Sequence, residues 1–329
     1  MTDYYVNGST GNDTTGDGLG DGTAWATITR ALDSAEGTRV LAGDTLYVRS
    51  SVTYAEDVPL DEVGAAGTPI RIVGYTTTIT DEGKVTINGG TNCVLLGVAT
   101  GGLFTKFENF IFDSATGTAV DYGIGADNGV FQNCEFTNSA AGFSGDNDFT
   151  FFRCVFSTNS GVAANLDQAG VFIECRFTAN SGSPVVNCNN GVFAFCEFYN
   201  NAGNIQLSFD TNIGPHVVIN CTFDGENNAT SEGIVQDHAT SPNPLVAINN
   251  ILYDLGTGIR TDVAQTGSLY HIIGNNLINS NTTDYAANCA NSIGGDVTGA
   301  PVFTNEAGDD YSLGASPAID AGTDAGDLP

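Results

Sequence analysis

Carboxylates are the side chains of this sequence that are best suited to catalysis. Asp146 and Asp148 come just before one predicted strand, and Asp167 comes before the next at a similar offset. Two carboxyl groups about 5 to 10 Å apart on one face can hydrolyse a glycosidic bond, one as the acid and the other as base or nucleophile. Aspartate is also common in the exposed turns of an acidic protein. The pattern favours structural turns and keeps a hydrolytic site as the alternative.

A second group of carboxylates lies near the start of the chain. Asp13, Asp17 and Asp21 are evenly spaced in a loop rich in Gly and Thr. Such a loop can surround a calcium ion with carboxylate and carbonyl oxygens, although the spacing matches no defined calcium loop. A plain solvated loop is favoured over a calcium site, and no other cofactor is indicated.

Histidine offers little for a metal site. His216, His238 and His271 lie far apart in the sequence, so a metal triad among them is disfavoured. Asp210 and the Asp237-His238 pair are further candidates for lining an acidic groove.

The eight cysteines form no CxxC pair. Five of them recur at a regular interval, and we expect their side chains to point inward at neighbouring positions slightly too far apart for a relaxed disulfide. A stack of buried thiols, used as a small apolar filler, is therefore favoured over disulfides or a metal cluster. Free thiols indicate folding in a reducing compartment.

The five cysteines belong to a repeat that defines the architecture. The pattern apolar-x-x-Cys-x-Phe recurs about every 20 to 25 residues, a period typical of solenoid proteins. Its copies are Phe131/Cys134/Phe136, Phe151/Cys154/Phe156, Phe172/Cys175/Phe177, Phe193/Cys196/Phe198 and Val218/Cys221/Phe223. Degenerate copies are Phe107/Phe110/Phe112, Ala247/Asn250/Leu252 and Ile273/Asn276/Ile278. The sequence therefore predicts an all-β chain that is wound into a single parallel β-helix.

Each repeat must contain a bend. The Cys and the second Phe are two residues apart and face the same side of a strand, whereas the first apolar residue lies three before the Cys. Because side chains of a strand alternate with a period of two, the chain turns a corner between them. Glycines before the repeats and asparagines after them suit turns that need positive φ or a side-chain hydrogen bond. These residues are Gly129, Gly170, Gly191, Asn138, Asn159, Asn180 and Asn201.

Stacking the coils about 4.8 Å apart places like residues above one another. The second Phe of each repeat should contact the next, and the cysteines should form a parallel column inside. On the outer surface, Arg176 lies one coil from Glu197, where an ion pair is worth up to about 1 kcal/mol.

Both ends of a β-helix expose strand edges that must be covered. Trp25, Ile28, Ala31, Leu32 and Ala35 recur at helical spacing, which predicts a short amphipathic helix over the first coil. We therefore divide one structural domain into an N-terminal cap (residues 1–44), the coils (45–298) and an irregular C-terminal capping segment (299–329).

The net charge of −29 limits the partners of the chain. It repels phosphate backbones and anionic membranes, and the nine Lys and Arg residues form no basic stripe, which argues against nucleic acid as a ligand. It also opposes anionic polysaccharides unless a divalent cation bridges the two, and favours neutral polysaccharides or proteins. The segment after Met1 shows no signal-peptide pattern, and no apolar run is long enough for a membrane span.

The two ends of the chain resemble a known superfamily. The opening Tyr4-Tyr5-Val6-Asn7-Gly8, Gly11-Asn12-Asp13, Trp25-Ala26-Thr27-Ile28 and Gly43-Asp44-Thr45-Leu46-Tyr47-Val48 is similar to the start of the pectate-lyase-like right-handed β-helix superfamily. The ending Pro301-Val302-Phe303, Asp310-Tyr311-Ser312-Leu313 and Ser316-Pro317-Ala318-Ile319-Asp320-Ala321-Gly322 looks like its closing segment. The resemblance implies a right-handed coil but no single function, because this superfamily includes polysaccharide lyases, glycoside hydrolases, phage tailspikes and members with no known activity.

Lyases of this superfamily need a basic residue that removes the C5 proton of the sugar, usually beside aspartates that bind calcium. The basic residues near the coils are Lys84, Lys106, Arg153, Arg176 and Arg260. None of them matches a lyase motif, so the resemblance gives no lyase site.

The leaderless start, the reduced cysteines, the acidity and the missing lyase motif favour a non-enzymatic phage or virus-particle protein, such as a capsid decoration, head spike or tail component. We expect it in the virion after assembly in the host cytoplasm, with an extracellular location as the alternative. Other virion proteins or a neutral polysaccharide are the expected partners, and a homotrimer is compatible with this role. The competing function is a carbohydrate-active enzyme, a glycoside hydrolase before a polysaccharide lyase. The sequence leaves enzymatic activity open and favours a non-enzymatic role.

Overall fold

The computed structural model describes residues 1–61, 64–96, 104–123, 128–209, 214–237, 243–261, 271–289, 293–308 and 310–317. Within these residues, parallel strands make up almost all of the regular structure, beside one short α-helix and two 3-10 helices. The predicted all-β parallel β-solenoid is therefore confirmed. The chain forms two compact units, Met1–Asp167 (unit 1) and Gln168–Pro329 (unit 2). The division of one domain at residues 44 and 298 stays a prediction.

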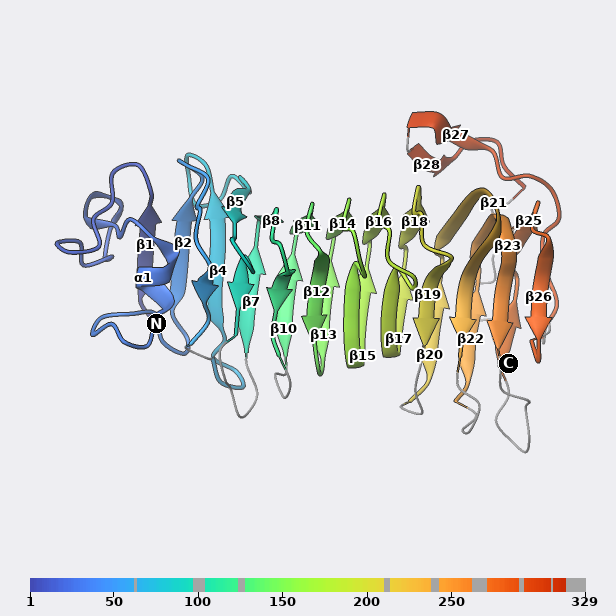
Figure 1. Cartoon of the computed structure of the whole chain (residues 1–329), viewed down its shortest axis with the longest axis horizontal. Helices are drawn as coiled ribbons and strands as arrows, with labels where there is room; N and C mark the ends of the chain where they lie inside the picture. The colour runs from blue at the N-terminus through green and yellow to red at the C-terminus, as the bar shows by residue number, and fades with distance from the viewer. Residues whose placement is uncertain are drawn as a thin grey trace. The chain divides into compact units, whose positions relative to one another are not determined.

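Unit 1 is wound from coils whose strands align in three parallel sheets (Figure 1). The first sheet contains β1 (Asp3–Asn7), β2 (Thr45–Arg49), β4 (Ile70–Tyr75), β7 (Thr105–Glu108), β10 (Gly129–Gln132) and β13 (Phe149–Phe152). The second contains β5 (Val85–Asn88), β8 (Phe110–Asp113), β11 (Glu135–Thr137) and β14 (Val155–Ser157). The third contains β3 (Val58–Pro59), β6 (Val94–Leu95), β9 (Thr118–Asp121) and β12 (Ala141–Gly145).

Unit 2 repeats the arrangement, after β15 (Ala164–Ile173), which contains the boundary between the units. Its first sheet contains the end of β17 (Val186–Ala194), β20 (His216–Ile219), β22 (Leu245–Ile248) and β24 (Ile272–Gly274). The second contains β16 (Arg176–Thr178), β18 (Glu197–Tyr199), the starts of β21 (Thr222–Gln236) and β23 (Ile251–Thr261), and β25 (Leu277–Asn279). The third contains the start of β17, β19 (Ile205–Phe209), the ends of β21 and β23, and β26 (Thr283–Ala287).

A residue with left-handed backbone conformation makes the corner between the first and second sheets. Asn133, with a φ of 53°, stands between Phe131 and Cys134, and Asn220, with a φ of 54°, directly precedes Cys221. Asparagine tolerates this conformation better than most residues because its short polar side chain can bond locally. The corner predicted inside each repeat is confirmed.

The glycines before the repeats do not make turns, contrary to the prediction. Gly129 lies in β10 and Gly191 lies in β17, and Gly170 lies inside β15. A Cβ atom on Gly129 would lie 2.6 Å from the ring of Phe149, and one on Gly191 would lie 2.6 Å from the ring of Phe193. These two glycines are needed because aromatic rings fill the space beside the backbone, which a linear sequence pattern does not reveal.

The asparagines after the repeats play two roles. Asn138 has a φ of 53° and makes the turn itself. Asn159 is fully buried instead, and its Nδ2 donates to the carbonyl oxygen of Phe136 at 3.0 Å. In unit 2, Asn201 Nδ2 donates to the carbonyl oxygen of Phe177 at 2.9 Å, while its Oδ1 accepts from the amide of Asn180 at 3.0 Å. Buried side-chain amides therefore satisfy the backbone at this second corner.

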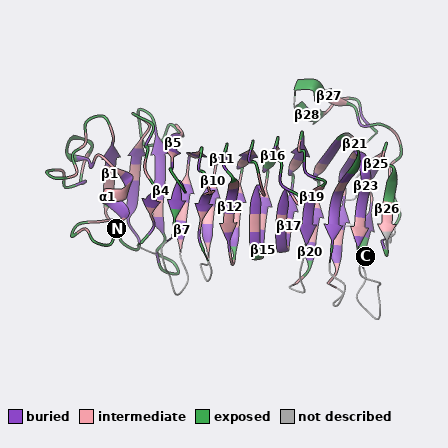
Figure 2. Cartoon of the chain, in the orientation of Figure 1, coloured by how far each residue is buried: buried purple, intermediate pink, exposed green. Residues whose placement is uncertain are grey.

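Most strand residues of each unit are buried or half-buried (Figure 2), and inside each unit like residues stack on like residues. Ring centroids of Phe136 and Phe156 are 4.6 Å apart in unit 1, and Phe198 lies 4.5 Å from Phe177 and 4.6 Å from Phe223 in unit 2. The rings in these three pairs are nearly parallel and fully buried. All eight cysteines are free and buried, so both the stacks within each unit and the reduced thiols agree with prediction.

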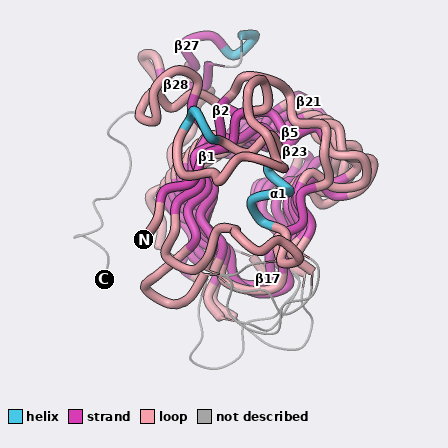
Figure 3. The backbone as a smooth tube through the Cα atoms, turned by 90° about the vertical axis from the view of Figure 1, so that its left-hand side faces the viewer, coloured by secondary structure: helices cyan, strands magenta, loops and turns pink. Residues whose placement is uncertain are grey.

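The N-terminal cap contains the helix α1 (Ile28–Leu32), whose buried residues are Ile28, Ala31 and Leu32. Figure 3 shows α1 in front of the sheets at the end where the chain begins. The Glu56 carboxylate accepts the amides of Ile28 and Thr29 at 3.0 and 2.8 Å, which satisfies two free donors of the first turn. The helix is shorter than predicted, because Ala35 lies beyond its end and is exposed.

The C-terminal segment forms an antiparallel hairpin of β27 (Phe303–Asn305) and β28 (Asp310–Leu313). The rings of Tyr311 and Tyr199 are 4.7 Å apart, so the hairpin lies against β18 of the second sheet. The predicted closing residues from Ala318 onward lie outside the described residues.

Candidate functional site

The three aspartates predicted to flank a hydrolytic site lie in different settings. Asp146 and Asp148 lie between β12 and β13, where Asp146 is half-buried and Asp148 is exposed with a φ of 43°. Asp167 is exposed within β15. Of the three, Asp148 lines a pocket of unit 1, and the described lining residues of that pocket include neither Asp146 nor Asp167. Of the further candidates, Asp237 is exposed directly after β21 (Thr222–Gln236), and Asp210 and His238 lie outside the described residues.

The pocket beside Asp148 has a volume of about 320 Å³, and we name it the lysine pocket. Its described lining residues are Gly67, Pro69, Phe104, Thr105, Lys106, Asn128, Val130, Asp148 and Thr150. Lys106 alternates with buried neighbours in β7, so its side chain lies on the outer face of the first sheet. Among those lining residues only Lys106 and Asp148 carry a charge, one of each sign.

A second cation lies next to Lys106 through the strand register. Arg71 of β4 pairs with Lys106 of β7, one coil away. Glu108 connects the two cations: its Oε1 lies 2.7 Å from Arg71 Nη2, and its Oε2 lies 3.2 Å from Lys106 Nζ. This group of three carries one net positive charge on a strongly acidic protein. The sequence pattern singled out Lys106 but missed Arg71 and Glu108.

An acidic pocket lies beside the hairpin in unit 2, with a volume of about 670 Å³. Its described lining residues are Asn200, Asp224, Glu226, Phe303, Thr304, Asn305, Glu306, Ala307 and Tyr311. Asp224 is almost fully buried and accepts hydrogen bonds from Tyr311 Oη at 3.0 Å and from the amide of Glu226 at 2.8 Å. Sequence analysis missed this pocket because its walls come from segments far apart in the chain.

Two carboxyl groups of the acidic pocket have a raised pKa, which favours their protonated form. Burial raises the pKa of Asp224, and the negative charge of Asp254 adds to the effect, against the hydrogen bonds from Glu226 and Tyr311. Burial also raises the pKa of Glu306, with further contributions from Asp224 and Asp254. Carboxyl groups shifted in this direction are suited to act as general acids.

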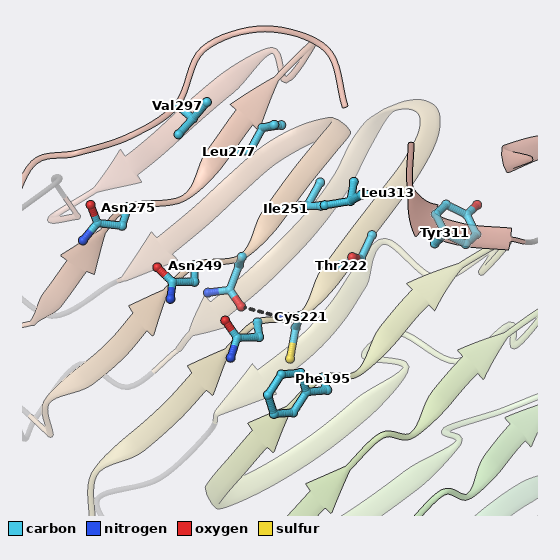
Figure 4. A pocket seen from close by; sticks show the side chains of 12 residues that line it. Phe195, Cys221, Thr222, Asn249, Ile251, Asn275, Leu277, Val297, Tyr311 and Leu313 are labelled. Carbon is cyan, nitrogen blue, oxygen red and sulfur yellow. Dashed lines mark hydrogen bonds between the residues drawn. The ribbon is translucent and has the colours of Figure 1, made fainter. Parts of the chain in front are cut away.

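A groove runs along the corner between the first and second sheets of unit 2, and we name it the corner groove (Figure 4). Its volume is about 330 Å³. Its described lining residues are Phe195, Asn220, Cys221, Thr222, Asn249, Asn250, Ile251, Asn275, Leu277, Val297, Tyr311 and Leu313. Asn275, Asn249 and Phe195 lie in a row in the figure, and Leu313 of the hairpin faces Ile251. Each residue of this row stands directly before an inward Cys or Asn of the repeat. That position in the sequence is the signal that could have identified the row.

In the loop considered as an alternative calcium site, the carboxylates make other interactions. Asp13 Oδ1 accepts the amides of Ala26 and Thr27 at 2.7 and 3.1 Å. Hydrogen bonds from the Thr23 side chain and the Leu19 amide lower the pKa of Asp17. Asp21 lies 3.4 Å from Arg49 Nη1. The described residues contain no group of three His, Cys, Asp or Glu that could hold a metal ion, and calcium binding stays the alternative to a plain solvated loop.

No curated protein sequence matches the chain. The family model for the right-handed β-helix region matches residues 92–251. Among solved structures, pectate lyase Pel9A has a TM-score of 0.65 at 14% identity, over 100% of this chain and 93% of its own. The chain therefore has the fold of a right-handed parallel β-helix.

Two further structures share the fold of this β-helix protein. An alginate lyase from Paenibacillus sp. has a TM-score of 0.56 at 11% identity, over 88% of this chain and 99% of its own. A rhamnogalacturonan lyase has a TM-score of 0.53 at 12% identity, over 89% and 84%. The pectate-lyase-like resemblance is thereby confirmed for the fold, which polysaccharide lyases share. None of these comparisons indicates a phage or virus-particle role. No helix among the described residues is long and apolar enough to cross a membrane.

Proposed function

We propose that this β-helix protein is a polysaccharide lyase that cleaves a uronate-containing glycan in the lysine pocket. The observation that carries the proposal is that Lys106 and Asp148 line the same pocket, and that the second cation, Arg71, lies one coil from Lys106. The fold shared with lyases of pectate, alginate and rhamnogalacturonan supports the same reaction class. The proposal places a lyase before a hydrolase, which is the reverse of the order expected from the sequence. It also takes the place of the non-enzymatic virus-particle role.

The two charged residues suit the two requirements of β-elimination. Lys106 binds the uronate carboxylate and withdraws charge from it, which acidifies the proton on the adjacent carbon. Asp148 accepts that proton, and a carbon–carbon double bond forms in the sugar. The leaving oxygen departs with the bonding electrons and takes up a proton from water. Asp148 takes the role of base in this scheme because it is the carboxylate of the pocket, while Lys106, whose Nζ lies 3.2 Å from Glu108 Oε2, is its cation.

Single substitutions test the scheme with the purified chain and acidic polysaccharides, by the ultraviolet absorbance of the unsaturated product. Asp148→Asn should lower kcat by about 100-fold or more, the usual contribution of a positioned base. Lys106→Ala should raise KM and also lower kcat, because Lys106 both binds the carboxylate and acidifies the proton. The matched controls are Asp167→Asn, an exposed aspartate outside the pocket, and Arg176→Ala, whose exposed pair with Glu197 measures 3.1 Å. No unsaturated product from the wild type, or equal losses in the controls, would contradict the proposal.

A second candidate is hydrolysis of a glycan in the acidic pocket. It is favoured by the raised pKa of both Asp224 and Glu306 in a space of about 670 Å³. The two candidates give different products, because hydrolysis releases reducing ends without ultraviolet absorbance. Glu306→Gln should abolish hydrolysis and leave elimination unchanged. Elimination products that persist in this variant would support the lysine pocket.

A further inference from the structure

The corner groove of unit 2 combines one aromatic residue with a column of amides. The left-handed corner residues of four successive coils are Phe195, Asn220, Asn249 and Asn275, with φ values of 56°, 54°, 59° and 54°. The strands before them pair in register, Ala194 with Ile219, Ile219 with Ile248 and Ile248 with Gly274. At a coil spacing of about 4.8 Å, the four positions span about 15 Å.

Phe195 is unfavourable for the fold on two counts. The residue is 57% exposed to solvent, although burying its ring would stabilise the protein. Its φ of 56° is a conformation that bulky side chains rarely adopt. In other coils the same corner is occupied by polar residues, namely Asn109, Asn133, Arg153 and Glu174. A strained and exposed aromatic residue at a position where polar residues suffice points to a functional contact.

The hairpin supplies a fixed opposite wall to the groove. Leu313 and Tyr311 of β28 line it, and Tyr311 is held by its hydrogen bond to Asp224 and by ring contact with Tyr199. Ile251 and Leu277 form apolar parts of the lining and are almost fully buried. A volume of about 330 Å³ falls within the range of small-ligand sites, at its lower end.

The described lining residues of the corner groove carry no formal charge, although the protein as a whole has a net charge of −29. Side-chain amides offer both donors and acceptors, which match hydroxyl groups. The electron-rich face of an aromatic ring attracts the C–H groups on the flat side of a sugar. A phosphate, a uronate or a basic peptide would find no opposite charge among these residues.

We infer that the corner groove is a binding site for a neutral, extended oligosaccharide, with one sugar on Phe195 and the next ones along the asparagine column. This inference is independent of the proposed lyase activity, since it concerns another surface and an uncharged ligand. The protein would then recognise neutral and acidic sugars at separate sites.

The test measures binding of neutral oligosaccharides to the full chain by isothermal titration calorimetry, with β-linked glucan, mannan and galactan fragments of four to six sugars as probes. Phe195→Asn introduces the residue that occupies this corner in several other coils. It should lower affinity about tenfold or more, while the melting temperature stays equal or rises. Asn220→Gly removes one side-chain amide and puts in a residue that also adopts the left-handed backbone conformation. It should lower affinity about twofold to tenfold. The matched control is Asn133→Gly at the same corner in unit 1, which should bind normally.

Three outcomes would overturn the inference. The first is that the wild type binds no neutral probe. The second is that Phe195→Asn binds as well as the wild type. The third is that sedimentation shows a dimer which Phe195→Asn dissociates, because the groove would then be an interface between two copies. Lyase activity with unsaturated products can persist in all three cases, so the two proposals fail independently.

Discussion

His216 is a fully buried histidine in unit 2, with its ring stacked on Phe209 at a centroid distance of 4.3 Å. Neither ring nitrogen has a hydrogen-bond partner among the described residues. Burial, with a smaller contribution from the neighbouring His271, lowers the pKa of His216 to about 4. The native state therefore keeps this ring neutral over the whole neutral and mildly acidic range.

We predict that this histidine makes the protein sensitive to acid. The unfolded chain takes up a proton as the pH falls below about 6.5, whereas the native ring does not until about 4, so stability is full above 6.5 and falls by up to about 3 kcal/mol between these values. Urea unfolding at pH 7 and pH 5 measures the loss. His216→Phe keeps the stacking and should flatten the dependence, and an equally steep profile in this variant would contradict the assignment.

The buried thiols should react very slowly in the native protein. Burial raises the pKa of Cys93 to about 11 and that of Cys188 to about 12, and all eight cysteines are buried. Because the thiolate is the reactive form, a thiol reagent should label the native protein very slowly and should find all eight cysteines after denaturation. A lower count in denaturant without reductant would mean that disulfides form in solution.

The stacked phenylalanines set the stability of the coils. Phe177 is fully buried against Phe198, at a centroid distance of 4.5 Å. Phe177→Ala should lower the free energy of unfolding by about 3 to 5 kcal/mol, because the neighbouring coils cannot collapse into the cavity. Phe195→Asn is the matched control at an exposed ring, and chemical denaturation should show little loss. Similar losses in both variants would show that the stack is not the source of stability.

Asn249 and Asn250 are neighbours at one corner, and substituting them one at a time distinguishes a structural role from a binding role. Asn250 is almost fully buried, and its Oδ1 accepts the Cys221 amide at 2.9 Å while its Nδ2 donates to the Val218 carbonyl oxygen at 3.0 Å. Asn250→Ala should cost about 2 to 4 kcal/mol, since it orphans buried backbone groups. Asn249→Gly, at the half-buried groove position, should cost within about 1 kcal/mol and weaken binding of neutral sugar. Thermal melts and calorimetry on both variants measure the contrast.

Sequence periodicity predicted the coils well and the sites poorly, for a physical reason. The repeat of Cys134 and Phe136 is a local pattern in which each coil repeats the same inward positions, so the stacking follows from spacing alone. Arg71 and Lys106 meet only through the register of β4 and β7, which depends on the length of the intervening loops. Asp224 and Tyr311 are 87 residues apart and meet because the hairpin folds back on the second sheet. No local spacing encodes such contacts.

The whole molecule is acidic, and this affects how a uronate polymer would reach the lysine pocket. The net charge of −29 repels such a polymer at long range, while the nearby charges of Arg71, Lys106, Glu108 and Asp148 sum to zero. Long-range repulsion therefore outweighs local attraction during encounter. Raising the ionic strength from about 10 mM to about 150 mM shortens the screening length from about 30 to about 8 Å, which removes most of that repulsion.

We therefore predict that the KM for an acidic polysaccharide falls several-fold over this range of salt, the reverse of what a basic binding surface would show. Binding of a neutral oligosaccharide in the corner groove should not change, because no formal charge enters the interaction, and it serves as the internal control. Steady-state kinetics and calorimetry at both ionic strengths measure the two quantities on the same preparation. A KM that rises with salt would mean that Lys106 and Arg71 dominate the approach of the substrate despite the charge of the whole chain.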